Sequence, residues 1–264
     1  MVGQPFVSKK RILLTGAAGG IGSAFFCSAT EQYLFRLADV NTASMSKMAS
    51  EKHEVVTLDV ANLNACQQAC RNIDVVIHLA ANPDPGADFY PSLLSNNIQG
   101  TYNIFRAAKD QGCQRVIFAS SVQVFAGYPA DVQAHPQSPL RPMNMYGVSK
   151  CFGEAVASYF AHAEGLSSIV LRIGAYDRNA DPLNPLRQEP GPHHLSSYVS
   201  ERDLNQLLVR CVETPDVQFA VVHGISNNRF KCLDITSTRD LFGYQPQDDA
   251  FEIFQTDLQM WLQG

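Results

Sequence analysis

A doubly wound α/β fold with a parallel sheet is the fold class that this sequence predicts. Between residues 11 and 173, short apolar runs alternate with segments of helical periodicity, as expected for strand–helix–strand units with right-handed crossovers. The run 74–81 is apolar almost throughout, which is typical of a strand covered on both faces. A glycine-rich turn follows the first apolar run, at the point where such folds bind nucleotides.

The expected elements follow from this alternation. Each strand is a short apolar run, and each helix has apolar residues at helical spacing. Strands are expected at 11–15, 33–38, 54–58, 74–81, 115–119 and 167–173, and helices after residue 22 and at about 62–71, 91–110 and 144–163. We therefore expect a Rossmann domain over residues 1–174.

After residue 174 the pattern changes. Residues 177–198 are rich in Pro, Asn and His and are expected to form a loop. A helix at about 200–213, a short strand at 219–222 and a final helix at about 249–262 follow. We expect residues 175–264 to form a small substrate-binding lobe that closes over the carboxyl ends of the strands without folding independently.

Composition indicates an ordinary globular chain. The 264 residues are 45% hydrophobic and 17% charged, which is enough to bury a large core. The net charge of −5 offers no basic surface for nucleic acid. No apolar run reaches the roughly 18 residues of a membrane span, and residues 1–10 lack the order of a signal peptide. We expect a cytoplasmic protein with no nucleic-acid or membrane partner.

The cysteines support this expectation. The seven cysteines include no CxxC pair, and an odd number argues against a disulfide framework. Cys66 and Cys70 are four residues apart, but no His or further Cys nearby completes a metal site. The sequence therefore predicts buried thiols in a reducing compartment, and no metal.

The glycine-rich turn is the first candidate binding site. Its sequence is Gly16-Ala-Ala-Gly19-Gly20-Ile21-Gly22, placed between the first strand and the first helix. Glycines let the backbone approach a diphosphate, whose charge is stabilised at the helix N-terminus. The turn therefore predicts a dinucleotide site.

Asp39 ends the second expected strand and indicates which dinucleotide binds. A carboxylate there accepts hydrogen bonds from the adenosine ribose and repels a 2′-phosphate. The alternative is a plain strand–helix turn followed by a capping aspartate. We favour NAD over NADP.

Tyr146 and Lys150 form the second candidate site. They are four residues apart in a helical pattern and thus share one face of the helix. A free phenol has a pKa near ~10, and we expect the neighbouring ammonium to lower that pKa and make Tyr146 a general base. The alternative is an ordinary surface pair.

These motifs together give a family resemblance. The whole chain resembles an extended-type short-chain dehydrogenase/reductase, of the NAD-dependent epimerase/dehydratase superfamily. The matching segments are residues 15–22, Asp39, Asp59-Val60, His78-Leu-Ala-Ala81, Asn97 in Asn-Ile-Gln-Gly-Thr, Phe118-Ala-Ser-Ser121 and Tyr146-Gly-Val-Ser-Lys150. Seven such pieces in the right order are far more specific than any one alone.

Two groups within the superfamily are most similar. Residues 116–121, 146–154 and 171–174 look like uronate dehydrogenases, and residues 202–204, 217–228 and 243–249 resemble the short-chain-type, NAD-dependent glucose-6-phosphate dehydrogenases of archaea. Both groups oxidise an aldose at C1. The resemblance therefore implies an oxidoreductase of carbohydrate metabolism that forms a lactone.

The resemblance also implies the roles of individual residues. Tyr146 is expected to remove the C1 hydroxyl proton, Lys150 to hold the nicotinamide ribose and lower the pKa of Tyr146, and Ser121, rather than Ser120, to hydrogen-bond the reacting oxygen. Asn97 is expected to support the site more than to touch substrate. The residues expected to bind the cofactor are Gly16, Gly19, Gly20, Ile21, Gly22, Asp39, Asp59, Val60, Leu79, Ala80, Ala81, Asn97, Tyr146, Lys150 and Ile173.

The chain departs from uronate dehydrogenases around the substrate. Those enzymes follow the catalytic serine with Asn-His, where this chain has Val122 and Gln123, and they bind the carboxylate with an arginine where it has His193. Losing a guanidinium removes the fork suited to a carboxylate. The candidate substrate contacts are Ser121, Gln123, Arg187 and His193, and Arg178 and His194 could join the last two around a carboxylate or phosphate. The alternative for each of these four loop residues is a solvated side chain that binds no substrate.

Three functions remain open. The favoured one is an NAD-dependent C1 dehydrogenase acting on a free sugar, uronate or sugar phosphate, because the chain after the Rossmann domain is short for holding a nucleotide sugar. The second is a nucleotide-sugar epimerase with retained NAD. The third is a non-catalytic, NAD-sensing protein, which the intact Ser121, Tyr146 and Lys150 disfavour.

A homodimer is expected from the same resemblance, through the helices at about 91–110 and 144–163. Their apolar residues would equally serve the domain core. These residues are Ile104, Ala107, Ala108, Phe152, Val156 and Phe160.

Overall fold

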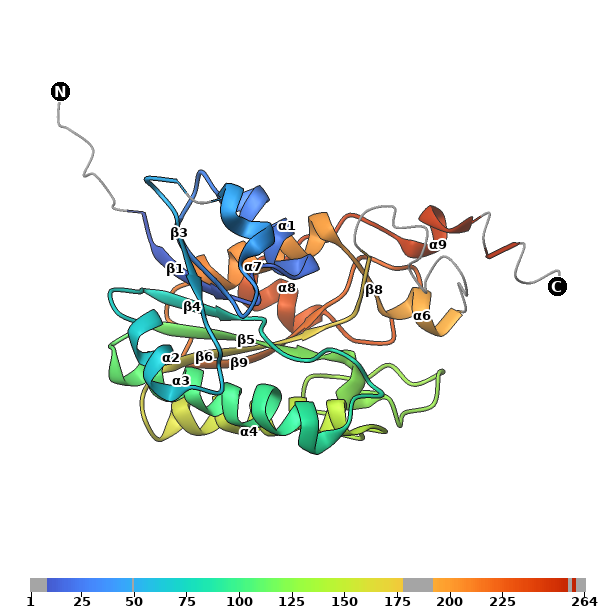
Figure 1. The fold of residues 1–264 in the computed structure, drawn as a ribbon. Helices are drawn as coiled ribbons and strands as arrows, with labels where there is room; N and C mark the ends of the chain where they lie inside the picture. The colour runs from blue at the N-terminus through green and yellow to red at the C-terminus, as the bar shows by residue number, and fades with distance from the viewer. Residues whose placement is uncertain (1–8, 49, 178–191, 256–257, 260–264) are drawn as a thin grey trace, which may run out of the picture.

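A seven-stranded parallel sheet forms the centre of the molecule (Figure 1). The computed structural model describes residues 9–48, 50–177, 192–255 and 258–259. The strands lie in the order β3-β2-β1-β4-β5-β6-β9, and every neighbouring pair is parallel. Their bounds are β1 Arg11–Thr15, β2 Leu34–Asp39, β3 Glu54–Thr57, β4 Val75–His78, β5 Arg115–Ser121, β6 Ser167–Ile173 and β9 Phe219–Gly224. The predicted doubly wound fold is confirmed.

Helices cover both faces of this sheet (Figure 1). One face carries α1 (Gly20–Ala29), α7 (Glu201–Glu213) and α8 (Thr236–Phe242); the other carries α2 (Leu63–Ala69), η2 (Phe89–Gln99), α3 (Gly100–Asp110) and α4 (Met145–His162). Short 3-10 helices lie at η1 (Ala43–Met48) and η3 (Val122–Phe125).

Alternate strand residues enter two separate cores. In β1, Ile12 and Leu14 face the α1 side, whereas Leu13 faces the α3 side. In β5, Ile117 and Phe118 divide in the same way. Such strands must be apolar on both faces, which explains why the sequence showed continuous apolar runs instead of alternation.

The helix predicted at 91–110 is two elements. Residues Phe89–Gln99 form a π-helix, and α3 follows from Gly100. Four of the apolar residues expected at a dimer interface do not reach the surface. Ile104, Ala107, Ala108 and Phe160 are buried in the core between the sheet and its helices. They stabilise the domain itself because they face inward.

The segment after residue 174 contributes to the main fold and to a region beyond the strand ends. β9 is the seventh strand of the sheet, and α7 packs on α1. The expected loop contains part of a small parallel sheet, β7 (Ala175–Asp177) with β8 (Tyr198–Ser200), and the helix α6 (Pro192–Ser197). Of the expected final helix, α9 spans Ala250–Ile253, and part of the remainder lies outside the described residues.

Candidate active site

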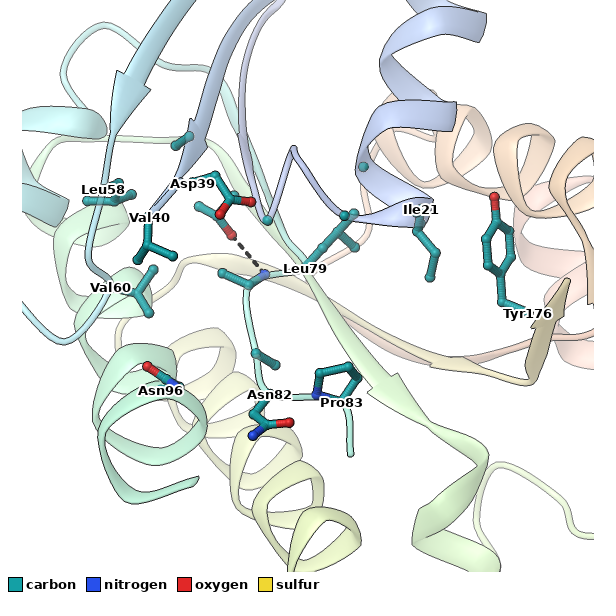
Figure 2. A pocket seen from close by; sticks show the side chains of 18 residues that line it. Ile21, Asp39, Val40, Leu58, Val60, Leu79, Asn82, Pro83, Asn96 and Tyr176 are labelled. Atoms are coloured by element: carbon teal, nitrogen blue, oxygen red, sulfur yellow. Dashed lines mark hydrogen bonds between the residues drawn. The ribbon is translucent and has the colours of Figure 1, made fainter. Parts of the chain in front are cut away.

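A cleft of about 590 Å³ lies beyond the carboxyl ends of β1 to β4. The chain reverses its direction of strand addition between β1 and β4, and such switch points are where ligands bind in open α/β sheets. Figure 2 shows Asp39, Val40, Leu58 and Val60 gathered at one end of the cleft, with Ile21 and Tyr176 toward the other.

The glycine-rich turn forms the floor of this cleft beside the N-terminus of α1. Gly16 has φ +69°, and a Cβ there would lie 2.8 Å from the backbone nitrogen of Ala80. A Cβ on Gly22 would lie 2.5 Å from the carbonyl oxygen of Gly16. Only glycine fits both positions. The bare backbone and the positive end of α1 suit a diphosphate.

Asp39 supplies the negative charge of the cleft. Its carboxylate accepts hydrogen bonds from the backbone nitrogens of Ala18, at 3.0 Å, and Asn41, at 3.3 Å. These bonds fix the side chain beside the turn. Among the described residues that line the cleft, no Lys or Arg accompanies it. The arrangement suits ribose hydroxyls and disfavours a 2′-phosphate.

The side of the cleft near Asp39 is apolar. Leu58 and Val60, which follow β3, line it. The neighbouring Asp59 is exposed and accepts a hydrogen bond from the backbone nitrogen of Ala61 at 2.9 Å. A flat base would therefore meet Val60, while the Asp59 side chain stabilises the turn.

The middle of the cleft is built from the chain after β4. Leu79, Ala80 and Ala81 line it as predicted, and Asn82, Pro83 and Asn96 join them. Thr15 ties this segment to β1: its hydroxyl accepts from the backbone nitrogen of Ala80, at 3.3 Å, and lies 2.8 Å from Nδ1 of His78.

Asn97 is buried behind the cleft. Its side chain accepts a hydrogen bond from the backbone nitrogen of Asn82, at 2.9 Å, and donates to the hydroxyl of Ser149 at 3.0 Å. Ser149 in turn donates to the carbonyl oxygen of Tyr146 at 2.6 Å. Asn97 thus connects the wall of the cleft to α4 and does not line the cleft itself.

Ser121, Tyr146 and Lys150 come together where β5 ends and α4 begins. All three are buried, at 8%, 8% and 5% exposure. A hydrogen bond joins Ser121 to the phenol of Tyr146. Lys150 donates to the carbonyl oxygen of Ala119 at 2.8 Å, and its ammonium lies 5.5 Å from the centre of the Tyr146 ring.

The acid–base properties differ from the expectation. Burial raises the pKa of Tyr146 above its ordinary value, and the hydrogen bond from Ser121 opposes this rise without cancelling it. The prediction of a pKa lowered by Lys150 is therefore wrong for this structure, because desolvation of the phenolate is the larger effect. Burial also lowers the pKa of Lys150, to about 8.

Ser120 and Ser121 have different partners. Ser120 donates to the carboxylate of Glu154 at 2.6 Å. Glu154 also forms a buried ion pair with Arg172, with Nη2 2.7 Å from Oε2. Ser120 is thus held in the interior, which leaves Ser121 as the serine beside Tyr146.

The predicted substrate contacts are only partly described. Gln123 follows Ser121 in η3, and its side chain accepts a hydrogen bond from Nδ2 of Asn144 at 2.9 Å. Arg178, Arg187 and the side chain of His193 lie outside the described residues.

The remaining predicted cofactor contact, Ile173, is buried at the end of β6, where it pairs with Ser121 and Gly224. Ile173 does not line the cleft, and neither do Tyr146 and Lys150, which were also predicted to contact the cofactor.

Sequence reasoning missed the partners of the catalytic segment. Asn144 caps α4 by accepting from the backbone nitrogen of Gly147 at 2.7 Å. An Asn just before a helical pattern is a helix-start signal and could have been recognised. Tyr176, which lines the cleft from β7, carries no such signal.

The residues fit a dinucleotide. The cleft offers the four features that a dinucleotide needs: the bare backbone of the glycine turn, the positive end of α1, the carboxylate of Asp39 and an apolar wall. Within the described part of the chain, no group of three His, Cys, Asp or Glu side chains is placed to hold a metal ion. No described helix combines the length and apolar character needed to cross a membrane.

Comparisons with known proteins agree with this geometry. Residues 12–176 match the model of the NAD dependent epimerase/dehydratase family. The chain is 34% identical to NAD-dependent glucose-6-phosphate dehydrogenase of Haloferax volcanii, over 91% of this chain and 94% of that protein. It is also 34% identical to L-arabinose 1-dehydrogenase (NAD(P)(+)) of the same organism, over 93% and 99%.

The fold has a solved counterpart. A variant of uronate dehydrogenase from Agrobacterium tumefaciens, complexed with NAD, superposes with a TM-score of 0.83 at 31% identity. The alignment covers 96% of this chain and 90% of that structure.

Proposed function

The chain belongs to the NAD dependent epimerase/dehydratase family, and from this premise we propose that it is an NAD-dependent dehydrogenase that oxidises a sugar at C1. The observation that carries the proposal is the buried group of Ser121, Tyr146 and Lys150 at the carboxyl end of β5. This strand lies next to β4, and the dinucleotide cleft borders the carboxyl end of β4. The similar proteins named above include dehydrogenases of glucose 6-phosphate, L-arabinose and uronates. All of these are aldoses or their derivatives.

The cleft holds NAD. The turn 16–22 receives the diphosphate, Asp39 accepts hydrogen bonds from the adenosine ribose, and Val60 contacts the adenine. When bound, NAD supplies the acceptor for the hydride of C1. Lys150 holds the nicotinamide ribose, since its buried ammonium has hydrogens to donate beyond the one directed at Ala119.

Tyr146 is the base of the reaction. The phenolate takes the proton of the C1 hydroxyl as the C1 hydride departs, so the sugar loses one proton and one hydride and becomes a lactone. Ser121 hydrogen-bonds the reacting oxygen and the phenol. Because burial raises the pKa of Tyr146, the phenolate fraction at neutral pH is small, and it increases with pH.

The substrate is a free sugar, a uronate or a sugar phosphate. Arg187 and His193, with Arg178, are the candidates for an anion on the sugar. Residues 175–264 act as the substrate lobe, although β9 and α7 of this segment also complete the Rossmann layers. Support for the lobe comes from Tyr176, which reaches the cleft from β7.

We further propose a homodimer formed through η2, α3 and α4, which pack side by side. Their outer face carries large hydrophobic side chains open to solvent, and such exposed patches mark interaction sites. These side chains are Tyr90, Leu94, Tyr102, Val148 and Tyr159. A Tyr102→Glu/Tyr159→Glu double variant should be monomeric in analytical ultracentrifugation, whereas an unchanged dimer would place the interface elsewhere.

A cytoplasmic location is part of the proposal. All seven cysteines are free thiols, and thiols persist in reducing compartments.

The proposed function is tested by NADH formation at 340 nm with purified protein, NAD and a panel of sugars. The panel holds glucuronate, galacturonate, glucose, galactose, arabinose, xylose, fucose and glucose 6-phosphate. A clear rate with one of them supports the dehydrogenase. Interconversion of nucleotide sugars without net NADH would instead identify an epimerase, and NAD binding without any turnover would identify a sensor.

A further inference from the structure

The groups proposed to react with the sugar come from two different elements. Ser121 ends β5, whereas Tyr146 lies in the first turn of α4, and an irregular segment joins η3 to α4. Positioned groups lose most of their effect when they are displaced by about 1 Å. Some contact must therefore fix the start of α4 relative to the end of β5.

Gln123 and Asn144 form that contact. The backbone nitrogen of Gln123 donates to the hydroxyl oxygen of Ser121 at 3.2 Å. The side-chain oxygen of Gln123 accepts from Nδ2 of Asn144 at 2.9 Å. The side-chain oxygen of Asn144 accepts from the backbone nitrogen of Gly147, at 2.7 Å, in the turn that carries Tyr146. Three hydrogen bonds thus run from the serine to the tyrosine helix.

The backbone around this chain of bonds is tightly fitted. A Cβ on Gly147 would lie 2.7 Å from the carbonyl oxygen of Gln123, so the helix rests directly on η3. The approach to the helix is held as well, because the backbone nitrogen of Arg141 donates to the carbonyl oxygen of Val124 at 2.8 Å. Gln123 and Asn144 therefore meet in one fixed geometry.

We propose that Gln123 and Asn144 are a positioning pair that sets the distance between Ser121 and Tyr146 in the sugar dehydrogenase proposed above. The pair acts through α4 and needs no contact with the sugar. This assigns Gln123 a different role from the substrate contact expected from the sequence, because its side-chain oxygen is bonded to the helix cap.

Charge variants of the pair give a direct test. In Gln123→Glu, the carboxylate still accepts from Asn144. In Asn144→Asp, the carboxylate still caps α4, and the amide of Gln123 can turn to donate to it. The double variant places two carboxylates against each other and leaves no donor between them. The matched control is Gln32→Glu/Asn72→Asp, which makes the same charge changes at two exposed residues far along the chain from this contact.

Initial rates are measured with the sugar that gives activity and with NAD. We expect each single variant to lower kcat by less than about threefold. The kcat of the double variant should be at least about tenfold lower than the value obtained by multiplying the two single effects. Its KM for the sugar should stay within about twofold of the wild type. The control should keep both constants.

Additive effects of the two substitutions on kcat would overturn the proposal. A change of the sugar KM by Gln123→Glu alone would also overturn it, since that result identifies a substrate contact.

Hydrogen exchange of the backbone amides of 145–150 separates this proposal from the proposed function. Exchange should be faster in the double variant than in either single variant, whether or not any sugar is oxidised. Equal exchange in all variants would refute the pair. If the wild type oxidised no sugar but exchange was still faster in the double variant, only the proposed dehydrogenase activity would be refuted.

Discussion

Replacing Asp39 by Asn should weaken the preference for NAD over NADP. The Asp39 carboxylate accepts from the backbone nitrogen of Ala18, and an Asn side chain can keep this bond through its oxygen. The substitution therefore removes the charge with little change in shape. The 2′-phosphate of NADP would no longer meet a fixed negative charge at the ribose end of the cleft.

The expected magnitude follows from the position of Asp39. Two unit charges 4 Å apart interact by about 1 kcal/mol in bulk water and by about 4 kcal/mol at an effective dielectric of 20. The side chain is half-buried, which places the repulsion between these limits, at about 2 kcal/mol. We expect the ratio of kcat/KM for NAD to that for NADP to fall about 30-fold.

The assay is NADH and NADPH formation at two ionic strengths. Salt should weaken the discrimination of the wild type, because screening acts on the exposed part of the interaction, and should change the variant little. The matched control is Asp74→Asn at the other end of the sheet, where the carboxylate accepts from the backbone nitrogen of Arg11 at 2.7 Å. A ratio in Asp39→Asn within twofold of the wild type would refute the assignment of Asp39 to the ribose.

Further predictions concern the reacting groups and the turn. Tyr146→Phe should lower kcat at least about 100-fold while NAD affinity, measured by fluorescence titration, changes less than twofold; retained activity would exclude Tyr146 as the base. In the wild type, kcat/KM should rise from pH 6 to about 8, because the raised pKa of Tyr146 keeps the fraction of phenolate small at low pH. It should level off near pH 8, where Lys150 loses its proton. A fall over this range would contradict both assignments. Lys150→Met should abolish turnover yet raise the free energy of unfolding in urea by about 2 kcal/mol at pH 7. Burial lowers the pKa of Lys150 from 10.5 to about 8, and each pKa unit corresponds to about 1.4 kcal/mol of destabilisation that the methionine removes. The hydrogen bond to Ala119 that the variant loses reduces this gain by about 1 kcal/mol. This gain should be complete below pH 8 and vanish toward pH 10.5, because the unfolded chain binds the extra proton in that window; a gain that is constant with pH would point to packing instead. Gly16→Ala should weaken NAD binding at least about tenfold in the same titration, because φ is +69° and the Cβ would meet Ala80; unchanged affinity would show that the turn can adjust.

The sequence predicted the sheet well for a physical reason. Strands β1, β4, β5 and β6 are buried on both faces almost throughout and appear as continuous apolar runs. The π-helix Phe89–Gln99 was not predicted, since its pattern of apolar residues resembles that of an α-helix. The strands β7 and β8 have three residues each, which is too few for any periodicity.

The site was predictable where it consists of contiguous motifs. The turn 16–22 and the pair Tyr146 and Lys150 each lie within one short segment, and their spacing alone carries the chemistry. Contacts such as Gln123 with Asn144 join residues that are separated in sequence by loops. Their pairing depends on how η3 meets α4, which only the folded structure shows. The raised pKa of Tyr146 was missed for the same reason, because it depends on burial.

Deuterium transfer tests the central claim most directly. The sugar that gives activity would be supplied with deuterium at C1, and the nicotinamide product analysed by mass spectrometry. If C1 is the carbon oxidised, the NADH carries the deuterium and the lactone carries none. Unlabelled NADH would show that hydride leaves from another carbon and would contradict the account.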